Sequence, residues 1–467
     1  MVEKSYDVIV IGAGPGGYVA AIRAAQLGYK TAVIEREHLG GICLNWGCIP
    51  TKALLRAAEI YHLIQNAKAY GIHADNVSFD LPKLIARSRK VADKLSRGVG
   101  HLMKKNKITV IDGDATLLGK GKIGVTKDGS SIAEYDAPHI IIATGSRAKE
   151  LPHMPVDGKM ICTYKQAMVP ESLPKSLLVI GSGAIGIEFA SFYRTLGVQV
   201  SVVEQMDRIL PLEDEEISAL AAKAFIKSGM NLLTGSIAES VKKSSSNLIT
   251  TIKNAVGELQ KIETERIILA IGITGNVENI GLENVGVTVD QGNIHTDGWG
   301  RTDVEGIYAI GDVAGPPWLA HKAMHEGVIC VEKIAGLTNV HPINPNNIPA
   351  CTYSSPQIAS VGMSEAAAIE AGHEVKVGRY PFLANGKAIA LGESEGTIKT
   401  VFDTATGELL GAHMIGTDVT ELIQGYTIAK TMEGTEEELM HTVFPHPTLS
   451  EMMHESVLNA YGRTLHL

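Results

Sequence analysis

Runs of apolar residues that end in glycine recur along the chain, and they predict buried strands of parallel sheets. The first run, 8–11, leads through a glycine-rich turn into a helical pattern over 18–27 and a second apolar strand over 30–35. Strands that are apolar on both faces are typical of parallel sheets covered by helices, and the change of period marks the helix between them. The pattern therefore predicts a β-α-β unit near the N-terminus.

The same arrangement occurs once more, with an apolar strand at 177–180, a helix over 188–196 and a strand at 199–204. Each unit is closed by a later buried strand that ends in glycine, at 140–145 for the first and 267–272 for the second. A charged helical stretch (80–107) and an alternating segment typical of an antiparallel meander (122–134) are expected as insertions in the first unit.

A further apolar strand at 306–312 and a helix at 320–335 follow, and then a connector rich in Pro and Asn at 341–349, which predicts a domain boundary. Beyond it, short alternating strands are expected near Ile358, Val375, Thr397 and Leu409. The predicted fold is α/β, with two Rossmann-like dinucleotide-binding domains and a C-terminal α+β interface domain. Its expected boundaries are 1–145 and 273–343 for the first nucleotide domain, 146–272 for the second, and 344–467 for the interface domain.

Composition narrows the class of protein. A chain of 467 residues suggests about three domains. It has only five cysteines, an odd number, which favours a reducing compartment over a secreted disulfide framework. We expect a cytoplasmic protein without an export signal or a membrane span. The net charge of -9, taken with no evident basic stripe, argues against nucleic acid as a partner. No metal site is predicted.

The first glycine-rich turn matches a dinucleotide-binding fingerprint. Gly12 permits the tight turn, Gly14 lets the backbone approach a pyrophosphate, and Gly17 allows close packing of the helix. Glu35, at the end of the second strand, can accept a hydrogen bond from a ribose hydroxyl. An ordinary glycine-rich turn is the alternative, but strand, turn, helix, strand and acid all occur in order.

The second unit repeats the fingerprint with Gly181, Gly183, Gly186 and Glu204. The distance from first glycine to acid is 23 positions in both units. We therefore expect two dinucleotides, one acting as electron donor and the other as acceptor. Because a carboxylate at position 204 accepts a bond from a free 2′-hydroxyl and repels a 2′-phosphate, NAD is favoured over NADP in the second site.

Two cysteines, Cys43 and Cys48, stand five positions apart just after the first unit. A disulfide that closes so short a loop gains little from chain entropy, so it is a weak staple and a plausible reagent. The alternative, two buried and inert cysteines, stays open on the pair alone. Asp312 likewise has two interpretations, as an acid facing a cofactor at the carboxyl edge of a sheet or as the cap of a turn.

Together these motifs resemble the flavin disulfide reductases, the class I pyridine nucleotide-disulfide oxidoreductases. The resemblance runs from end to end, through both fingerprints, the segment from Cys43 to Lys52, the strand before Asp312, and the segment 446–451. It implies that the first fingerprint binds FAD and the second NAD. It also implies further FAD contacts from Asp312, Ala115, Thr144, Gly145 and Ala320, and an NAD contact from Gly272.

The resemblance assigns the chemistry as well. Cys43 is expected to form a mixed disulfide with the substrate, while Cys48 lies against the flavin as a thiolate. Lys52 is expected near the flavin N5, paired with Glu188. A helix that starts at Pro50 would add the dipole of its N-terminus near Cys48.

His446 and Glu451 form a second constellation. Thiol exchange needs a base, histidine exchanges protons near neutral pH, and a carboxylate can orient its ring. The alternative is a helix that starts at Pro447 with an acid in its first turn. In the resembling family this pair faces the disulfide of the other subunit, which implies a homodimer with shared active sites.

Among the branches of that family, the one that oxidises protein-bound dihydrolipoamide with NAD is favoured. Ile185 stands where glutathione-reducing members carry tyrosine, and the tail 459–467 has no cysteine pair. The expected partners are lipoyl domains of a 2-oxo acid dehydrogenase complex or a glycine cleavage system. The alternatives are an NADPH-dependent reductase of small disulfides and a non-catalytic redox-sensing flavoprotein. Trp46 and the segment 273–276 depart from the family pattern.

Overall fold

The computed structural model describes residues 4–467, which form two compact units. The first unit comprises the described residues up to Leu54 together with 81–149 and 272–343. The second comprises 55–80, 150–271 and 344–467. The helix α3 (Cys48–Gln65) begins in the first unit and ends in the second. The four-segment domain division expected from the sequence stays a prediction.

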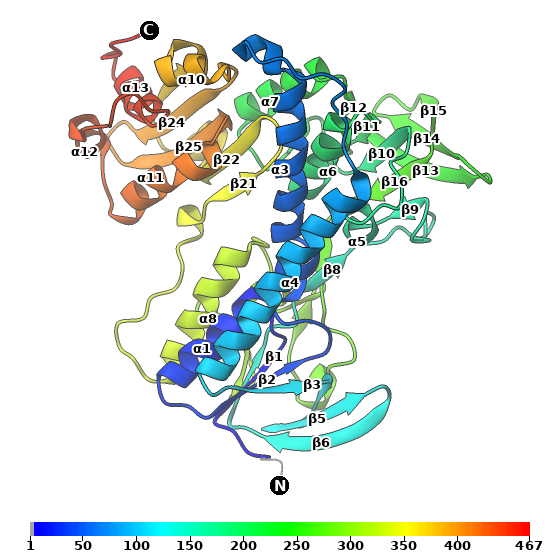
Figure 1. Cartoon of the computed structure of the whole chain (residues 1–467). Helices are drawn as coiled ribbons and strands as arrows, with labels where there is room; N and C mark the ends of the chain where they lie inside the picture. Colours follow the sequence, from blue (N-terminus) through cyan, green and yellow to red (C-terminus); the bar gives the residue numbers. More distant parts are fainter. Residues whose placement is uncertain (1–3) are drawn as a thin grey trace. The chain divides into compact units, whose positions relative to one another are not determined.

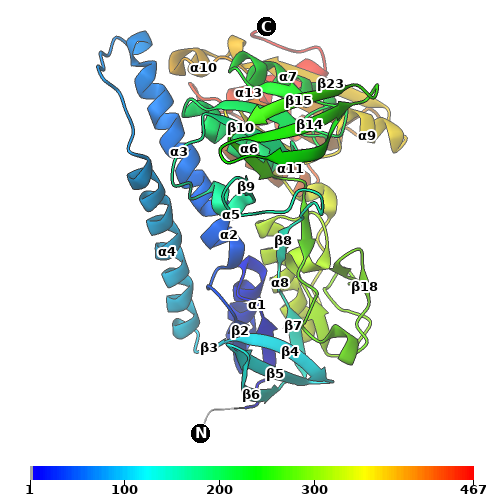
Figure 2. The same cartoon turned by 90° about the vertical axis from the view of Figure 1, so that its right-hand side faces the viewer.

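The first unit is built around a five-stranded parallel sheet in the order β20-β7-β1-β2-β3. Figure 1 labels β1, β2 and β3 of this sheet, and Figure 2 labels β7. Its further elements are an antiparallel sheet β4-β5-β6, two strand pairs and the helices that cover them. The bounds in this unit are β1 Val8–Ile11, α1 Pro15–Gln26, β2 Thr31–Glu35, α2 Gly41–Trp46, α4 Leu81–Lys105, β3 Thr109–Asp112, β4 Asp114–Gly119, β5 Lys122–Lys127, β6 Ser130–Asp136, β7 His139–Ile142, β8 Ser146–Ala148, β17 Ile273–Gly275, η2 Leu282–Asn284, β18 Val289–Asp290, β19 Asn293–Ile294, β20 Ile307–Ala309, η3 Gly311–Ala314 and α8 Ala320–Ile334.

The predicted β-α-β pattern of the first unit is confirmed. Strand β1 is fully buried and lies between β2 and β7. Its side chains alternate between two cores, with Ile9 and Ile11 packed towards the antiparallel sheet β4-β5-β6 and Val8 and Val10 packed with α1. Burial on both faces is what the continuous apolar run requires.

The second unit contains a five-stranded parallel sheet in the order β12-β11-β10-β16-β9, a five-stranded antiparallel sheet in the order β21-β22-β25-β24-β23 and a three-stranded sheet β13-β14-β15. Figure 1 labels most of these strands. The bounds in this unit are η1 Ala67–Tyr70, β9 Ile161–Cys162, α5 Tyr164–Ala167, β10 Ser176–Ile180, α6 Ala184–Thr195, β11 Gln199–Val203, α7 Glu215–Lys227, β12 Asn231–Leu233, β13 Ser236–Lys243, β14 Leu248–Asn254, β15 Leu259–Thr264, β16 Arg266–Leu269, η4 Pro345–Asn347, β21 Ala350–Thr352, β22 Gln357–Gly362, α9 Glu365–Glu370, β23 Val375–Pro381, η5 Phe382–Ala384, α10 Gly386–Leu391, β24 Thr397–Asp403, β25 Leu409–Gly416, α11 Val419–Thr431, α12 Glu436–His441 and α13 Glu451–Ala460.

A buried ion cluster joins helix α7 to the antiparallel sheet of the second unit. The Nζ atom of Lys399, on β24, lies 2.9 Å from both carboxylate oxygens of Asp214 and 2.9 Å from Glu365. Asp214 is also the N-cap of α7. Burial alone would raise the pKa of Asp214, but its bonds to Lys399 outweigh that effect and lower it. The cluster therefore fixes α7 to the C-terminal sheet with charges that compensate one another.

Among residues 4–467, no helix combines the length and the apolar composition that crossing a membrane requires.

Candidate active site

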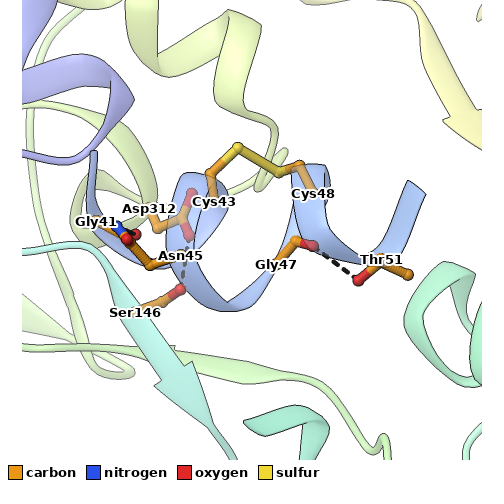
Figure 3. The surroundings of a disulfide bond; sticks show 8 residues. All are labelled: Gly41, Cys43, Asn45, Gly47, Cys48, Thr51, Ser146 and Asp312. Atoms are coloured by element: carbon orange, nitrogen blue, oxygen red, sulfur yellow. Dashed lines mark hydrogen bonds between the residues drawn. A yellow bond between two sulfur atoms is a disulfide. The ribbon is translucent and has the colours of Figure 1, made fainter. Parts of the chain in front are cut away.

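The disulfide predicted as a candidate reagent is formed, between Cys43 on α2 and Cys48 at the start of α3 (Figure 3). Their Cα atoms lie 4.7 Å apart. One residue, Gly47, separates the two helices, and a Cβ atom there would lie 3.1 Å from the carbonyl oxygen of Ile42. The break between the helices thus brings the two cysteines together.

Hydrogen bonds hold the residues around this break. Asn45 is buried, and its Nδ2 donates to the carbonyl oxygens of Leu39 and Gly41 at 3.1 and 2.9 Å. On the other side, the hydroxyl of Thr51 donates to the carbonyl of Gly47 at 2.7 Å. The segment is therefore rigidly positioned on both sides of the disulfide (Figure 3).

The expected helix start at Pro50 is two residues late, because α3 begins at Cys48. Proline is tolerated anywhere in a first turn, where no N–H is needed for the helix ladder. Cys48 itself is thus the first helical residue, and it lies at the positive end of the helix dipole. Lys52, four residues further along the same helix, is half-buried.

The first fingerprint has the geometry that its glycines predict. Gly12 has φ +97°, and a Cβ there would lie 2.4 Å from the carbonyl oxygen of Ala143. At Gly17 a Cβ would lie 1.9 Å from the carbonyl oxygen of Gly12, whereas a Cβ at Gly14 would meet no atom within 4 Å. Only Gly14 therefore faces open space, at the N-terminus of α1, where backbone N–H groups attract a phosphate.

The second fingerprint has the same geometry. Gly181 has φ +100°, with a Cβ position 2.3 Å from the carbonyl oxygen of Ala270, and a Cβ at Gly186 would lie 2.1 Å from the carbonyl oxygen of Gly181. A Cβ at Gly183, at the N-terminus of α6, would again meet no atom within 4 Å. In both loops, space is left beside the second glycine at a helix N-terminus, the kind of place that binds a pyrophosphate.

The two acids that end the fingerprints also bond back to their loops. Glu35 accepts from the backbone N–H of Ala13 at 2.7 Å. Glu204 accepts from the backbone N–H and the hydroxyl of Ser182, at 2.9 and 2.7 Å, and is buried. These bonds orient each carboxylate at the carboxyl edge of its sheet, where a ribose would lie.

Asp312 belongs to a polar cluster at the carboxyl edge of the first sheet. Its Oδ2 accepts from the hydroxyl of Ser146 at 2.6 Å, so its side chain does not cap the turn of η3. Burial raises the pKa of Asp312, and the bond to Ser146 and the charge of Lys322 offset only part of the rise. Figure 3 draws the Asp312–Ser146 pair among the surroundings of the disulfide.

Two members of this cluster were missed from the sequence. The buried Lys322, on α8, donates to the carbonyl of Gly315 at 2.8 Å and pairs with Glu326 at 2.9 Å. Glu326 in turn accepts from the N–H of Gly311. Their spacing of four on one helix was a visible signal, but such pairs are usually exposed to solvent.

The remaining predicted FAD contacts lie in the same unit. Ala115 is buried on β4, and Ala320 is the first residue of α8. The hydroxyl of Thr144 donates to the carbonyl of Asn276 at 2.8 Å, and the N–H of Asn276 donates to Gly145. Asn276, singled out as a departure from the family pattern, therefore holds the Thr144–Gly145 turn.

Trp46, the other departure, has a specific neighbour. The guanidinium carbon of Arg89, on α4, lies 4.4 Å from the centroid of its ring. This distance is within the range of a cation–π interaction. The ring between the two cysteines is therefore tied to α4.

Two predicted residues fall in a different unit from the groups expected beside them. Glu188 is buried on α6, and its Oε1 accepts from the N–H of Tyr353 at 2.9 Å. Its expected pairing with Lys52 stays a prediction. Gly272, expected at NAD, falls in the first unit, where its carbonyl accepts from Lys149.

The structure brings His446 and Glu451 together. Nδ1 of His446 lies 2.8 Å from Oε1 of Glu451, whose Oε2 accepts from the N–H of Thr448. Burial opposes ionisation of Glu451, but the bonds from Thr448 and His446 outweigh it and lower the pKa of this carboxyl. The His446 imidazole is largely exposed, and the Glu451 carboxylate fixes the orientation of its ring through Nδ1. The helix α13 begins at Glu451 rather than at Pro447.

Comparisons with known proteins agree on one family. The family model described as pyridine nucleotide-disulphide oxidoreductase matches residues 6–327, and the model of its dimerisation domain matches residues 348–457. Dihydrolipoyl dehydrogenases of Rhizobium etli and Zymomonas mobilis are 56% and 57% identical, over 99% of this chain and 99% of theirs. The crystal structure of LpdA from Mycobacterium tuberculosis matches with a TM-score of 0.90 at 28% identity, covering 97% of this chain and 99% of that chain.

Proposed function

This chain belongs to the pyridine nucleotide-disulphide oxidoreductase family, and on that premise we propose that it oxidises dihydrolipoamide to lipoamide and reduces NAD to NADH. The observation that carries the proposal is the Cys43–Cys48 disulfide, in the same unit as the first fingerprint. A dithiol substrate exchanges with a disulfide without any other reagent. The full-length relatives named for this activity support the choice of substrate.

FAD and NAD are the cofactors, and the residues present fit them. The loop from Gly12 to Gly17, with Glu35 and Asp312 at the same sheet edge, would hold FAD. The loop from Gly181 to Gly186, with Glu204, would hold NAD. Bound FAD would supply two-electron transfer between the dithiol pair and NAD.

The cysteines divide the exchange between them. A thiolate of the substrate attacks Cys43, a mixed disulfide forms, and Cys48 leaves as a thiolate. The helix N-terminus at Cys48 and the charge of Lys52 stabilise that thiolate. The second substrate thiolate then displaces Cys43, which releases lipoamide and leaves both cysteines reduced.

His446 is the base that removes protons from the substrate thiols, with Glu451 holding its ring through Nδ1. The orientation leaves Nε2 as the proton acceptor. We propose that this pair serves the disulfide of the partner subunit in a homodimer, as the resemblance implies and the dimerisation domain supports.

The proposed setting follows from the substrate. The dithiol would arrive on lipoyl domains of a 2-oxo acid dehydrogenase complex or a glycine cleavage system. A cytoplasmic location is proposed because Cys162 and Cys330 are not joined in a disulfide, as is usual for cysteines in reducing compartments.

The test compares two reactions of the purified protein loaded with FAD. NADH formation from dihydrolipoamide and NAD is expected, with NADPH oxidation by glutathione disulfide slower by about 100-fold or more, the discrimination that a charged group at the 2′-position supports. The reverse preference would replace the proposal with an NADPH-dependent disulfide reductase, the alternative that the acid Glu204 disfavours.

A variant tests the base. His446→Gln should retain FAD and lower the rate of dithiol oxidation by roughly 10²- to 10⁴-fold, the usual contribution of a general base. Reduction of a dye by NADH, which needs no substrate thiol, serves as the control and should stay unchanged. Near-normal oxidation of dihydrolipoamide would remove His446 from the mechanism.

A further inference from the structure

Helix α4 carries an unusual charge for this chain. Its 25 residues hold eight Lys and Arg residues against one acid, a net charge of +7, so the rest of the chain carries -16. The expectation that the chain lacks a basic stripe is therefore wrong. The total charge of -9 conceals a strongly basic element within an acidic protein.

The cations are arranged in one row. The row consists of Lys83, Arg87, Lys90, Lys94, Arg97 and Lys104. Spacings of four and three residues alternate along it, with His101 filling the position between Arg97 and Lys104. Residues at these spacings lie on one face of a helix. We call this row the α4 stripe. At 1.5 Å per residue it is about 32 Å long.

The α4 stripe faces solvent in this chain. All six of its Lys and Arg residues are exposed, whereas the buried positions of the helix are Ser88, Ala92, Val99 and Met103. The one acid of the helix, Asp93, pairs with Arg97. Like charges at these spacings destabilise a helix, so the arrangement is costly to the isolated fold.

The stripe lies on a helix that packs against the disulfide segment. The hydroxyl of Ser96 donates to the carbonyl of Leu39 at 2.8 Å, next to α2. Arg87 itself donates to the carbonyl of Ala53, on α3, at 3.2 Å. The guanidinium of Arg89 covers the ring of Trp46. Helix α4 also packs against α2, the helix that carries Cys43, and Figure 2 labels both helices. A partner seated on the stripe would therefore lie on a helix that contacts the disulfide segment.

We propose that the α4 stripe is the docking surface for an acidic protein domain that carries the dithiol substrate on a flexible arm. This inference rests on the proposed function and adds the chemistry of its partner. A small acidic domain matches a positive row about 32 Å long. A long polyanion such as a nucleic acid or an anionic membrane would also meet the acidic remainder of the chain, which repels it. The stripe raises the local concentration of the carrier beside the disulfide and accelerates encounter.

The experiment separates carrier from substrate. The variant Lys90→Glu/Lys94→Glu/Lys104→Glu changes three stripe residues that have no part in the chemistry. The control variant, Lys242→Glu/Lys253→Glu/Lys261→Glu, makes the same change of charge at exposed positions on β13, β14 and β15. Each FAD-loaded enzyme is assayed with free dihydrolipoamide and with the same dithiol attached to a lipoyl domain of net negative charge, at low and high salt.

The stripe variant should lose about 10- to 100-fold in kcat/KM for the domain-borne substrate at low salt, the range of electrostatic steering. It should keep its kcat/KM for free dihydrolipoamide, which also shows that it is folded. High salt should abolish most of the difference, and the control variant should change the domain reaction by less than about threefold.

Equal losses in the stripe and control variants would overturn the proposal in favour of an effect of total charge. An unchanged kcat/KM of the stripe variant for the domain-borne substrate would also overturn the proposal. This holds as well if the variant instead loses binding to single-stranded RNA or to phosphatidylserine vesicles, which would assign the stripe to a different partner. Failure of the wild-type enzyme to oxidise free dihydrolipoamide is a different result, which would overturn the proposed function itself.

Discussion

Gly12 and Gly181 begin two loops that share one backbone geometry. Their φ angles are +97° and +100°. A Cβ at Gly12 would clash with the carbonyl oxygen of Ala143, and a Cβ at Gly181 with that of Ala270. The third glycines, Gly17 and Gly186, likewise contact the first. Because these demands are set by the loop itself, the two units bind the same kind of ligand group.

The surroundings of the two loops differ. The segment before the disulfide covers the first loop, where the N–H of Gly40 donates to Ala13 at 2.8 Å and a Cβ on Gly41 would lie 2.7 Å from the Cα of Gly14. The second loop is open, since residues 183–185 are exposed and Ile185 is 42% exposed. A covered loop suits a cofactor that stays bound, and an open loop suits a nucleotide that exchanges at every turnover.

The largest effect is expected from alanine at the first glycine of each loop. A left-handed φ and a clash with backbone together cost about 2–6 kcal/mol. Gly12→Ala should weaken FAD binding by about 10²- to 10⁴-fold, whereas Gly181→Ala should keep FAD and lose NAD-dependent turnover. Visible flavin absorbance of the purified variants, together with dihydrolipoamide oxidation by ferricyanide, checks both. Loss of flavin from Gly181→Ala would break the distinction between the loops.

The acids should give the next largest effect. Glu204→Gln removes a charged acceptor and should raise KM for NAD by about 10- to 100-fold, the worth of a hydrogen bond to a charged group. It should also narrow the preference for NAD over NADP, since the repulsion of a 2′-phosphate is lost. In the matched variant Glu35→Gln, KM for NAD should be unchanged. Steady-state kinetics with both nucleotides measures this, and a changed KM in Glu35→Gln would contradict the separate roles.

A smaller effect is expected from the cover itself. Gly41 has φ +57° and lies against Gly14, so Gly41→Ala should displace the covering segment and speed FAD release by about tenfold. Ile185→Ala, on the open loop, should not alter FAD release. Flavin fluorescence after dilution reports the release rate. If the two variants released FAD equally fast, the cover would not be what retains it.

The smallest effect concerns pH. Burial raises the pKa of Asp312 in the first site, so the folded state holds a proton there that the unfolded chain has released. Stability should therefore fall as pH rises from the ordinary range of a carboxyl through that raised pKa. The variant Asp312→Asn should not show this fall in stability. Melting temperatures of the FAD-free protein, measured across that pH range, check the prediction.

Glu451, whose pKa is lowered rather than raised, serves as the control. Bonds from Thr448 and His446 outweigh burial and lower the pKa of Glu451, so its stabilising contribution is present above the ordinary glutamate range and is lost as pH falls through the lowered pKa. Glu451→Gln should remove that acid-side loss. Identical pH profiles for the two variants would contradict both assignments.

What could be predicted from the sequence was local. Each β-α-β unit is encoded within a short stretch, so period, glycines and terminal acid appear in order, and the strands pair as the runs imply, Val8 with Thr31 and Leu177 with Val200. The disulfide was visible because its partners are five positions apart.

What was missed depends on contacts between distant segments or on a view along a helix. Asn276 holds Thr144 across 132 positions, and the Asp312–Ser146 bond spans 166. No local pattern announces such pairs. The α4 stripe is local but becomes a feature only when residues are projected onto a helix, because in linear order its cations are diluted among apolar residues.

The single-residue break at Gly47 has a further consequence. Because α2 and α3 are anchored separately by Asn45 and Thr51, breaking the sulfur–sulfur bond need not let the two thiols drift apart. Each thiol therefore stays close to the other at a very high effective concentration, so it can attack a group attached to its neighbour. Any adduct formed on Cys43, whether with substrate or with an adventitious oxidant, can thus be cleared by its neighbour. The geometry that makes the disulfide reactive thus also prevents Cys43 from remaining in a covalent adduct.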